Sequence, residues 1–296
     1  QDNAENYTKF TGLTIYADEG ETEYPFKIWA QKTFSVSLGN NANANGLRLT
    51  FTDAANSSDV RYATVENGSA KLRTTSADEG KTFAVTSEIF GAPVSFGTVT
   101  IDETADYSLT VSGLYNNNNA NATFNAADMS LSYTGNATGS QFFVQNQAIK
   151  GEYWFGFKFK RNATDGVLST FLYINEGNLQ AYIYLVSIPG QLAVRVNGWT
   201  DYKVNGEPFG YGGINDPYVF IRRHNENGKV AYTIYMSATA SLDGAWSYTC
   251  TTGVEYSEDS AIGQFGFNAE ANYAEGVVIS NIYSADSSEK LLKKYL

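Results

Sequence analysis

The sequence of 296 residues contains one cysteine and one histidine. These two residues cannot supply a Cys/His zinc site, and a single cysteine cannot form an internal disulfide. Lys and Arg number 20 against 31 Asp and Glu, which gives a formal net charge of −11. Nucleic acid is therefore not an expected partner, because neutralising phosphates needs clustered cations. No apolar run approaches the ~18 residues of a membrane span, so the chain is not expected to span a membrane.

Helical signals are almost absent from the sequence. Only residues 287–296 combine an N-cap, helix formers and a spacing of three to four between apolar residues, which predicts a short C-terminal helix. The remaining apolar residues alternate with polar ones, and Gly, Asn and Asp interrupt the alternation. The pattern predicts strands at 33–38, 47–52, 81–87, 97–102, 107–112, 153–160, 167–174, 180–186, 191–197, 218–223, 230–236, 264–268 and 277–283. Many short strands separated by turns predict an all-β chain of antiparallel sandwiches or barrels.

An Asn-rich run divides the sequence. Residues 115–121 have low complexity and no apolar anchor, which is typical of a linker. We expect two tandem antiparallel β-sandwiches: a small one at 1–114, immunoglobulin-like or jelly-roll, and a larger one at 122–296 that ends in the short helix. The alternative, a long hairpin loop inside one domain, stays open.

The first residues, Gln1–Asn6, contain no initiator Met and neither the basic nor the apolar region of a signal peptide. We expect a mature exported chain, located in the periplasm, on the cell surface or outside the cell. The lack of disulfides favours a bacterial exterior over a eukaryotic one.

The strand faces carry the functional hypothesis. In 153–160 the Tyr and Phe residues share one face, which predicts the core, and Trp154 belongs to the other face. The outward faces of 180–186 and 191–197 combine aromatic and polar residues. Such a mixture suits a sugar, because a pyranose ring stacks on aromatic rings while its hydroxyls need planar donors and acceptors. The predicted ligand-binding residues of this one groove are Trp154, Tyr182, Tyr184, Arg195, Asn197 and Trp199. Cross-strand pairing alone is the structural alternative for these residues.

The second half resembles a known superfamily. An aromatic strand at 151–160, the sequence Asp-Gly-Val-Leu at 165–168 and a Gly-Gln-Leu-Ala-Val-Arg-Val strand at 190–196 carry the resemblance. Over residues 122–286 the chain resembles the concanavalin A-like lectin/glucanase superfamily, which includes laminin-G-like domains. The resemblance implies that the second domain is a concanavalin A-like jelly roll. It implies little about function, since one fold hosts many activities.

Catalysis has weaker support in the sequence than binding. A glycosidase needs two carboxylates roughly 5–10 Å apart, and the E-x-D-x-x-E spacing of glucanases with this fold is absent. Glu270 and Glu275 are the best remaining acid pair, and His224 reads as a residue that flanks a turn. Loop carboxylates could supply oxygen ligands to Ca²⁺, but no D-x-D-x-D-G pattern occurs, so no cofactor is expected.

These observations favour an exported, non-catalytic carbohydrate-binding protein whose partner is a polysaccharide or oligosaccharide. The arrangement resembles the tandem β-sandwich proteins of bacterial polysaccharide-utilisation systems. Two alternatives remain open. One is a glycan-cleaving hydrolase or lyase of the concanavalin A-like class, and the other is a protein-binding adhesion module.

Overall fold

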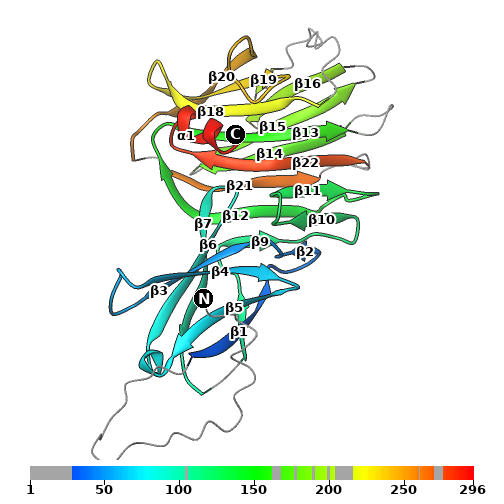
Figure 1. The fold of residues 1–296 in the computed structure, drawn as a ribbon. Helices are drawn as coiled ribbons and strands as arrows, with labels where there is room; N and C mark the ends of the chain where they lie inside the picture. Colours follow the sequence, from blue (N-terminus) through cyan, green and yellow to red (C-terminus); the bar gives the residue numbers. More distant parts are fainter. Residues whose placement is uncertain are drawn as a thin grey trace, which may run out of the picture.

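The computed structural model describes residues 29–103, 106–161, 168–176, 179–188, 191–198, 201–203, 216–259, 261–269 and 276–296. These residues form twenty-two strands, one short 3₁₀ helix, η2 (Ser76–Asp78), and one α-helix, α1 (Ser288–Lys293). The prediction of an all-β chain with a short C-terminal helix is confirmed. In Figure 1 the first half of the chain, blue to cyan, is stacked on the second half, green to red.

The first half is one curled sheet of seven strands. Ser95 and Ser112 exchange backbone hydrogen bonds of 2.7 and 3.3 Å, which brings β7 close to the segment that directly follows β8. The curled sheet encloses a core that includes Phe34, Phe51 and Phe83. In sheet order the strands are β7 (Ala92–Thr100), β6 (Thr82–Ile89), β3 (Arg48–Asp53), β4 (Val60–Glu66), β5 (Ser69–Thr75), β1 (Trp29–Ser37) and β8 (Asp106–Thr110).

The second half contains two sheets. The eight-stranded sheet runs β2 (Ala42–Asn43), β10 (Ala122–Asn125), β11 (Ser130–Tyr133), β22 (Val277–Ala285), β13 (Tyr153–Arg161), β18 (Tyr218–Glu226), β19 (Lys229–Ser237) and β20 (Trp246–Glu255). The seven-stranded sheet runs β17 (Asp201–Lys203), β16 (Gln191–Gly198), β15 (Leu179–Ile188), β14 (Leu168–Glu176), β21 (Ala261–Ala269), β12 (Gln141–Lys150) and β9 (Leu114–Asn116). Among the described strands of both halves, the β1–β8 and β2–β10 pairs are parallel and the other pairs are antiparallel.

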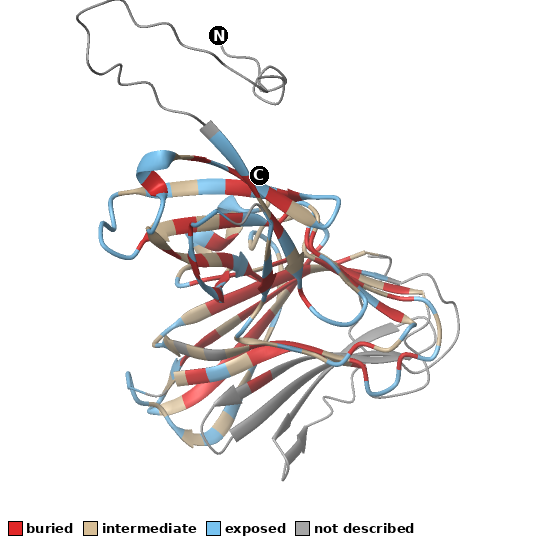
Figure 2. Ribbon diagram, turned by 90° about the horizontal axis from the view of Figure 1, so that it is seen from below, coloured by how far each residue is buried: buried red, intermediate tan, exposed pale blue. Residues whose placement is uncertain are grey.

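The inner faces of the two sheets in the second half pack together as the alternation predicts. Phe155 and Phe157 of β13 contact Phe265 and Phe267 of β21, with ring centroids 5.0 and 5.4 Å apart. All four rings are buried. Figure 2 shows buried segments along the described strands. The sandwich is therefore held by apolar burial between its sheets, the dominant favourable contribution in folding.

The Asn-rich run forms hydrogen bonds across the junction between the two halves. Leu114–Asn116 is strand β9, which pairs with β12. The amide of Asn116 donates to the carbonyls of Leu38 and Asn40 at 3.0 and 2.8 Å. The amide of Asn41 donates to the carbonyl of Asn119 at 2.8 Å. The domain boundary at 115–121 stays a prediction. The asparagines of this run form hydrogen bonds with the first half, so the run is more than a linker without contacts.

The hairpin between β6 and β7 inserts into the second half. Ile89 pairs with Ala92, so the loop consists of Phe90 and Gly91. Both residues have positive φ, as a type I′ turn requires, and this is unusual for a residue as bulky as Phe. Phe90 is fully buried against Phe124, Phe142 and Phe267, with centroids 5.6 to 6.0 Å away. The Ser284 hydroxyl donates to the Phe90 carbonyl at 2.6 Å.

Gly91 lets this loop approach the second half closely. A Cβ on Gly91 would lie 2.5 Å from the backbone oxygen of Ser284. Gly68 offers a matched control, because it is also the second loop residue of a two-residue hairpin with positive φ, yet a Cβ there meets nothing within 4 Å. We predict that Gly91→Ala destabilises the protein by ~1–3 kcal/mol more than Gly68→Ala, since only Gly91→Ala adds a steric clash. Urea unfolding of both variants measures the difference. Equal losses would contradict the close approach.

Candidate functional site

The candidate functional site is the outer face of the seven-stranded sheet in the second half. From here on, "the seven-stranded sheet" means this sheet. The register aligns Val144, Phe265, Ile174 and Ala181 in one row, and Ile174 is fully buried. This row belongs to the core face. Because successive residues of a strand alternate between faces, the neighbouring rows belong to the opposite, outer face.

Two of these outer rows contain the predicted sugar-binding positions. One row runs Phe143, Gly266, Tyr173, Tyr182 and Asn197 across five adjacent strands. The next outer row runs Gln141, Asn268, Phe171, Tyr184 and Arg195. The structure thus brings Tyr182, Tyr184, Arg195 and Asn197 together by backbone register, while their side chains, and the whole of Trp199, lie outside the described residues.

The described edge of this face has both aromatic and amide side chains. Tyr115 stacks on Phe143 with centroids 6.1 Å apart and an interplanar angle of 16°. Beside them the Gln145 amide donates to the Gln264 amide oxygen at 3.5 Å. A Cβ at Gly266 would lie 2.1 Å from the Phe142 carbonyl oxygen and 2.7 Å from the Phe143 ring, so glycine allows β21 and β12 to approach closely here. Tyr115 is 40% exposed and Phe143 only 5%, so the aromatic surface that lies beside these planar amides belongs to Tyr115.

Trp154 does not belong to this face. Its strand, β13, is part of the eight-stranded sheet, whereas β15 and β16 are part of the seven-stranded sheet. The expectation that strands 153–160, 180–186 and 191–197 form one groove is therefore wrong for Trp154. Alternation correctly separates the two faces of each strand, but it carries no information about which sheet the strand joins.

Trp154 instead lies in a compact cluster on the outside of the eight-stranded sheet. Its ring stacks on Tyr235 at 5.6 Å and an interplanar angle of 22°, and it is only 5% exposed. The Arg222 guanidinium lies 5.6 Å from the Trp154 ring centroid. Glu152 accepts hydrogen bonds from Trp154 at 3.0 Å and from Arg222 at 2.9 and 2.7 Å. The ring already has its stacking partners, so this cluster is structural.

Helix α1 covers the adjacent part of the same surface. Leu291 of the helix is buried with Trp154 and Phe220. A Cβ at Gly156 would lie 2.6 Å from the Tyr295 hydroxyl and 2.9 Å from Phe220, so glycine leaves room for the helix end. Of the two outer faces in the second half, the part of the eight-stranded sheet around Trp154 and Phe220 is therefore covered by the chain itself.

The catalytic alternatives gain no support from the described geometry. His224 is buried, and its Nε2 is 2.7 Å from the Thr233 hydroxyl, which is 2.8 Å from the Thr249 hydroxyl. These contacts make it a structural residue of the β18–β19 hairpin. Glu270 and Glu275 lie outside the described residues. Within the described ranges no three His, Cys, Asp or Glu side chains gather as metal ligands would, and none of the helices there has the length and hydropathy to cross a membrane.

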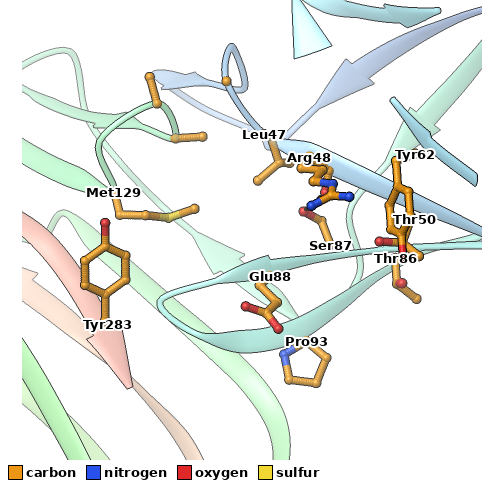
Figure 3. Close-up of a pocket in the computed structure, with 13 residues that line it drawn as sticks. Leu47, Arg48, Thr50, Tyr62, Thr86, Ser87, Glu88, Pro93, Met129 and Tyr283 are labelled. Carbon is orange, nitrogen blue, oxygen red and sulfur yellow. Dashed lines mark hydrogen bonds between the residues drawn. The ribbon is translucent and has the colours of Figure 1, made fainter. Parts of the chain in front are cut away.

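A pocket at the junction of the halves was not predicted from the sequence. It has a volume of about 530 Å³ and is lined from both halves, by Arg48, Tyr62 and Glu88 on one side and Met129 and Tyr283 on the other (Figure 3). The available sequence signal was that Arg48 and Thr50 alternate with the apolar residues of strand 47–52, so both belong to the face away from the core. Alternation within one strand cannot show that the second half covers that face.

The solved structures named here are distant likenesses of the chain. No protein-family model and no curated protein sequence matches the chain. Among solved structures, the cellulose induced protein Cip1 is 14% identical, with a TM-score of 0.35 over 60% of this chain and 87% of that chain. Arcelin-5, a lectin-like defense protein from Phaseolus vulgaris, is 14% identical, with a TM-score of 0.34 over 58% and 90%. Domains LG4-5 of the mouse laminin alpha1 chain are 10% identical, with a TM-score of 0.26 over 91% and 86%.

The neighbours thus include a lectin-like protein and laminin LG domains. With every TM-score below 0.5, the likeness carries no argument about activity. The description of the fold rests on the sheets themselves.

The Glu152 cluster gives a pH-dependent prediction. The hydrogen bonds from Arg222 hold the pKa of the Glu152 carboxyl below its ordinary value of 4.5, and outweigh the opposing effect of partial burial. A lowered pKa in the folded state adds stability above the unfolded value, and this stability is lost as the pH falls through the folded value. We predict that wild type has a higher melting temperature than Glu152→Gln at pH 7, and that the difference shrinks on acidification below about pH 4.5.

Glu66→Gln is the control for the change in net charge, because Glu66 is exposed and forms no ion pair within the described ranges. Thermal unfolding at several pH values measures both variants. A Glu152→Gln difference that stays constant from pH 7 to pH 3 would contradict the assignment.

Proposed function

We propose that the protein is an exported, non-catalytic carbohydrate-binding protein. It recognises an extended glycan on the outer face of the seven-stranded sheet in its second half. The observation that carries the proposal is the row of Tyr173, Tyr182 and Asn197 on three adjacent strands, which continues to the buried Gly266 and Phe143 at the described edge. Neighbouring strands lie ~4.8 Å apart, so this row extends far enough to follow more than one sugar ring.

The composition of the face supports a saccharide over an apolar ligand. Sugar rings have apolar C–H surfaces that stack on aromatic side chains, and hydroxyls that need planar donors and acceptors. At the described edge, the exposed Tyr115, which stacks on the buried Phe143, lies beside the Gln145–Gln264 amide pair. We therefore assign stacking to Tyr182 and Tyr184 and hydroxyl binding to Arg195 and Asn197, with Trp199 closing one end.

A glycan array on the purified chain, followed by calorimetry with the best ligand, tests the proposal. We expect Tyr182→Ala to weaken binding about tenfold or more, because it removes a stacking surface worth on the order of 1 kcal/mol beyond its buried area. Trp154→Phe is the matched aromatic control. It keeps a ring against Tyr235 on the other sheet, so the affinity should not change.

Two outcomes would contradict the proposal. One is a Tyr182→Ala variant that melts like wild type and binds the glycan with wild-type affinity. The other is release of reducing ends or unsaturated products from the bound glycan, which would show a hydrolase or lyase instead of a binding protein.

A further inference from the structure

The pocket at the junction of the two halves has the composition of a ligand site. Strands β3, β4, β6 and β7 of the first half line one side, and the β10–β11 turn and β22 of the second half line the other. Its volume of about 530 Å³ falls within the ~300–1,000 Å³ that is typical of small-molecule sites. Figure 3 shows charged, hydroxyl and aromatic side chains around one space.

Arg48 supplies a cation without a carboxylate partner. Its guanidinium lies 3.9 Å from the ring centroid of Tyr62, which is 54% exposed. In the part of the chain that the structure describes, Arg48 forms no ion pair, whereas Arg61 and Arg222 are paired with carboxylates at 2.7 Å. Stacking on Tyr62 restrains the guanidinium plane and leaves its N–H edges free, and such a planar fork binds carboxylates with two hydrogen bonds.

Glu88 and two threonines supply complementary groups in the same pocket. The Glu88 carboxylate is 68% exposed and lies 3.6 Å from the Lys294 ammonium, so its charge is partly compensated. Thr50 and Thr86 lie directly opposite each other on β3 and β6, and both line the pocket half-buried. These groups can accept and donate hydrogen bonds to hydroxyls. Pro93, Met129 and Tyr283 provide apolar lining.

We propose that this pocket binds a saccharide unit that carries a carboxylate, a hexuronate being the simplest example. Arg48 binds the carboxylate, Glu88 and the two threonines bind ring hydroxyls, and the apolar lining contacts the C–H surface. A simple anion is disfavoured, because Glu88 and the net charge of −11 repel it and it offers no hydroxyls in return. A neutral sugar would leave Arg48 without its partner. This site is separate from the outer face of the seven-stranded sheet and does not depend on binding there.

Titration of the full chain with methyl glucuronide, methyl glucoside and acetate tests the proposal, with calorimetry or NMR as the readout. We expect methyl glucuronide to bind at least tenfold more tightly than either control probe, and more weakly as salt is added. Arg48→Met should lower the glucuronide affinity about tenfold or more, and Arg48→Lys should also lower it, because lysine keeps the charge but loses the fork.

Lys71→Met is the charge-matched control, because Lys71 is an exposed residue of β5 that does not line the pocket, and it should bind like wild type. Melting temperatures verify that the variants are folded. Absence of glucuronide binding, equal binding of acetate or glucoside, or wild-type affinity in Arg48→Met would each overturn the proposal. Tyr182→Ala should retain glucuronide binding, so failure of the sheet face as a glycan site would be distinguishable from failure of this pocket.

Discussion

The burial of one hairpin tip, Phe90–Gly91, determines how the two halves of this protein are arranged. Phe90 adopts a positive φ that costs free energy for a bulky residue, and the cost is offset by burial among three Phe rings of the second half. The buried apolar residues of both halves consequently form one continuous cluster. The β2–β10 pairing and the asparagine hydrogen bonds add contacts along the same junction. The junction pocket depends on this arrangement, because its two walls belong to different halves.

The two outer faces of the second half differ in whether helix α1 packs on them. Helix α1 packs on the eight-stranded sheet, and Gly156 provides the space that Tyr295 and Leu291 need. Trp154, Arg222 and Glu152 complete that surface with mutual contacts. The outer face of the seven-stranded sheet instead combines Tyr, Asn, Gln and Arg positions in register. Around Trp154, the outer side chains of the eight-stranded sheet thus contact one another and helix α1. The polar and aromatic positions of the seven-stranded sheet in the second half are therefore the better candidate for a ligand.

The local residue pattern predicted strands and the C-terminal helix of this fold. Long-range strand pairing determined which strands share a sheet. Alternation in 153–160 correctly separated Phe155, Phe157 and Phe159 from Trp154, and capping correctly predicted the C-terminal helix. Alternation cannot report that β13 pairs with β22 and β18 rather than with β15, since those partners are distant in sequence. The apolar Leu291 and the small Gly156 were the available signals that the helix covers Trp154. The Phe90-Gly91 pair was another available signal in the sequence. A two-residue Phe-Gly turn places a bulky apolar residue at a hairpin tip, where its own sheet provides no core to bury it.

Native-state hydrogen exchange on wild type and Phe90→Ala tests most directly whether the hairpin tip couples the two halves. In wild type, peptides from the cores of both halves should exchange with one common opening free energy. Phe90→Ala should lower that free energy by about 3–5 kcal/mol, and the two halves should then open separately. The account would be contradicted if the two halves of wild type already open independently, or if Phe90→Ala leaves both opening free energies unchanged.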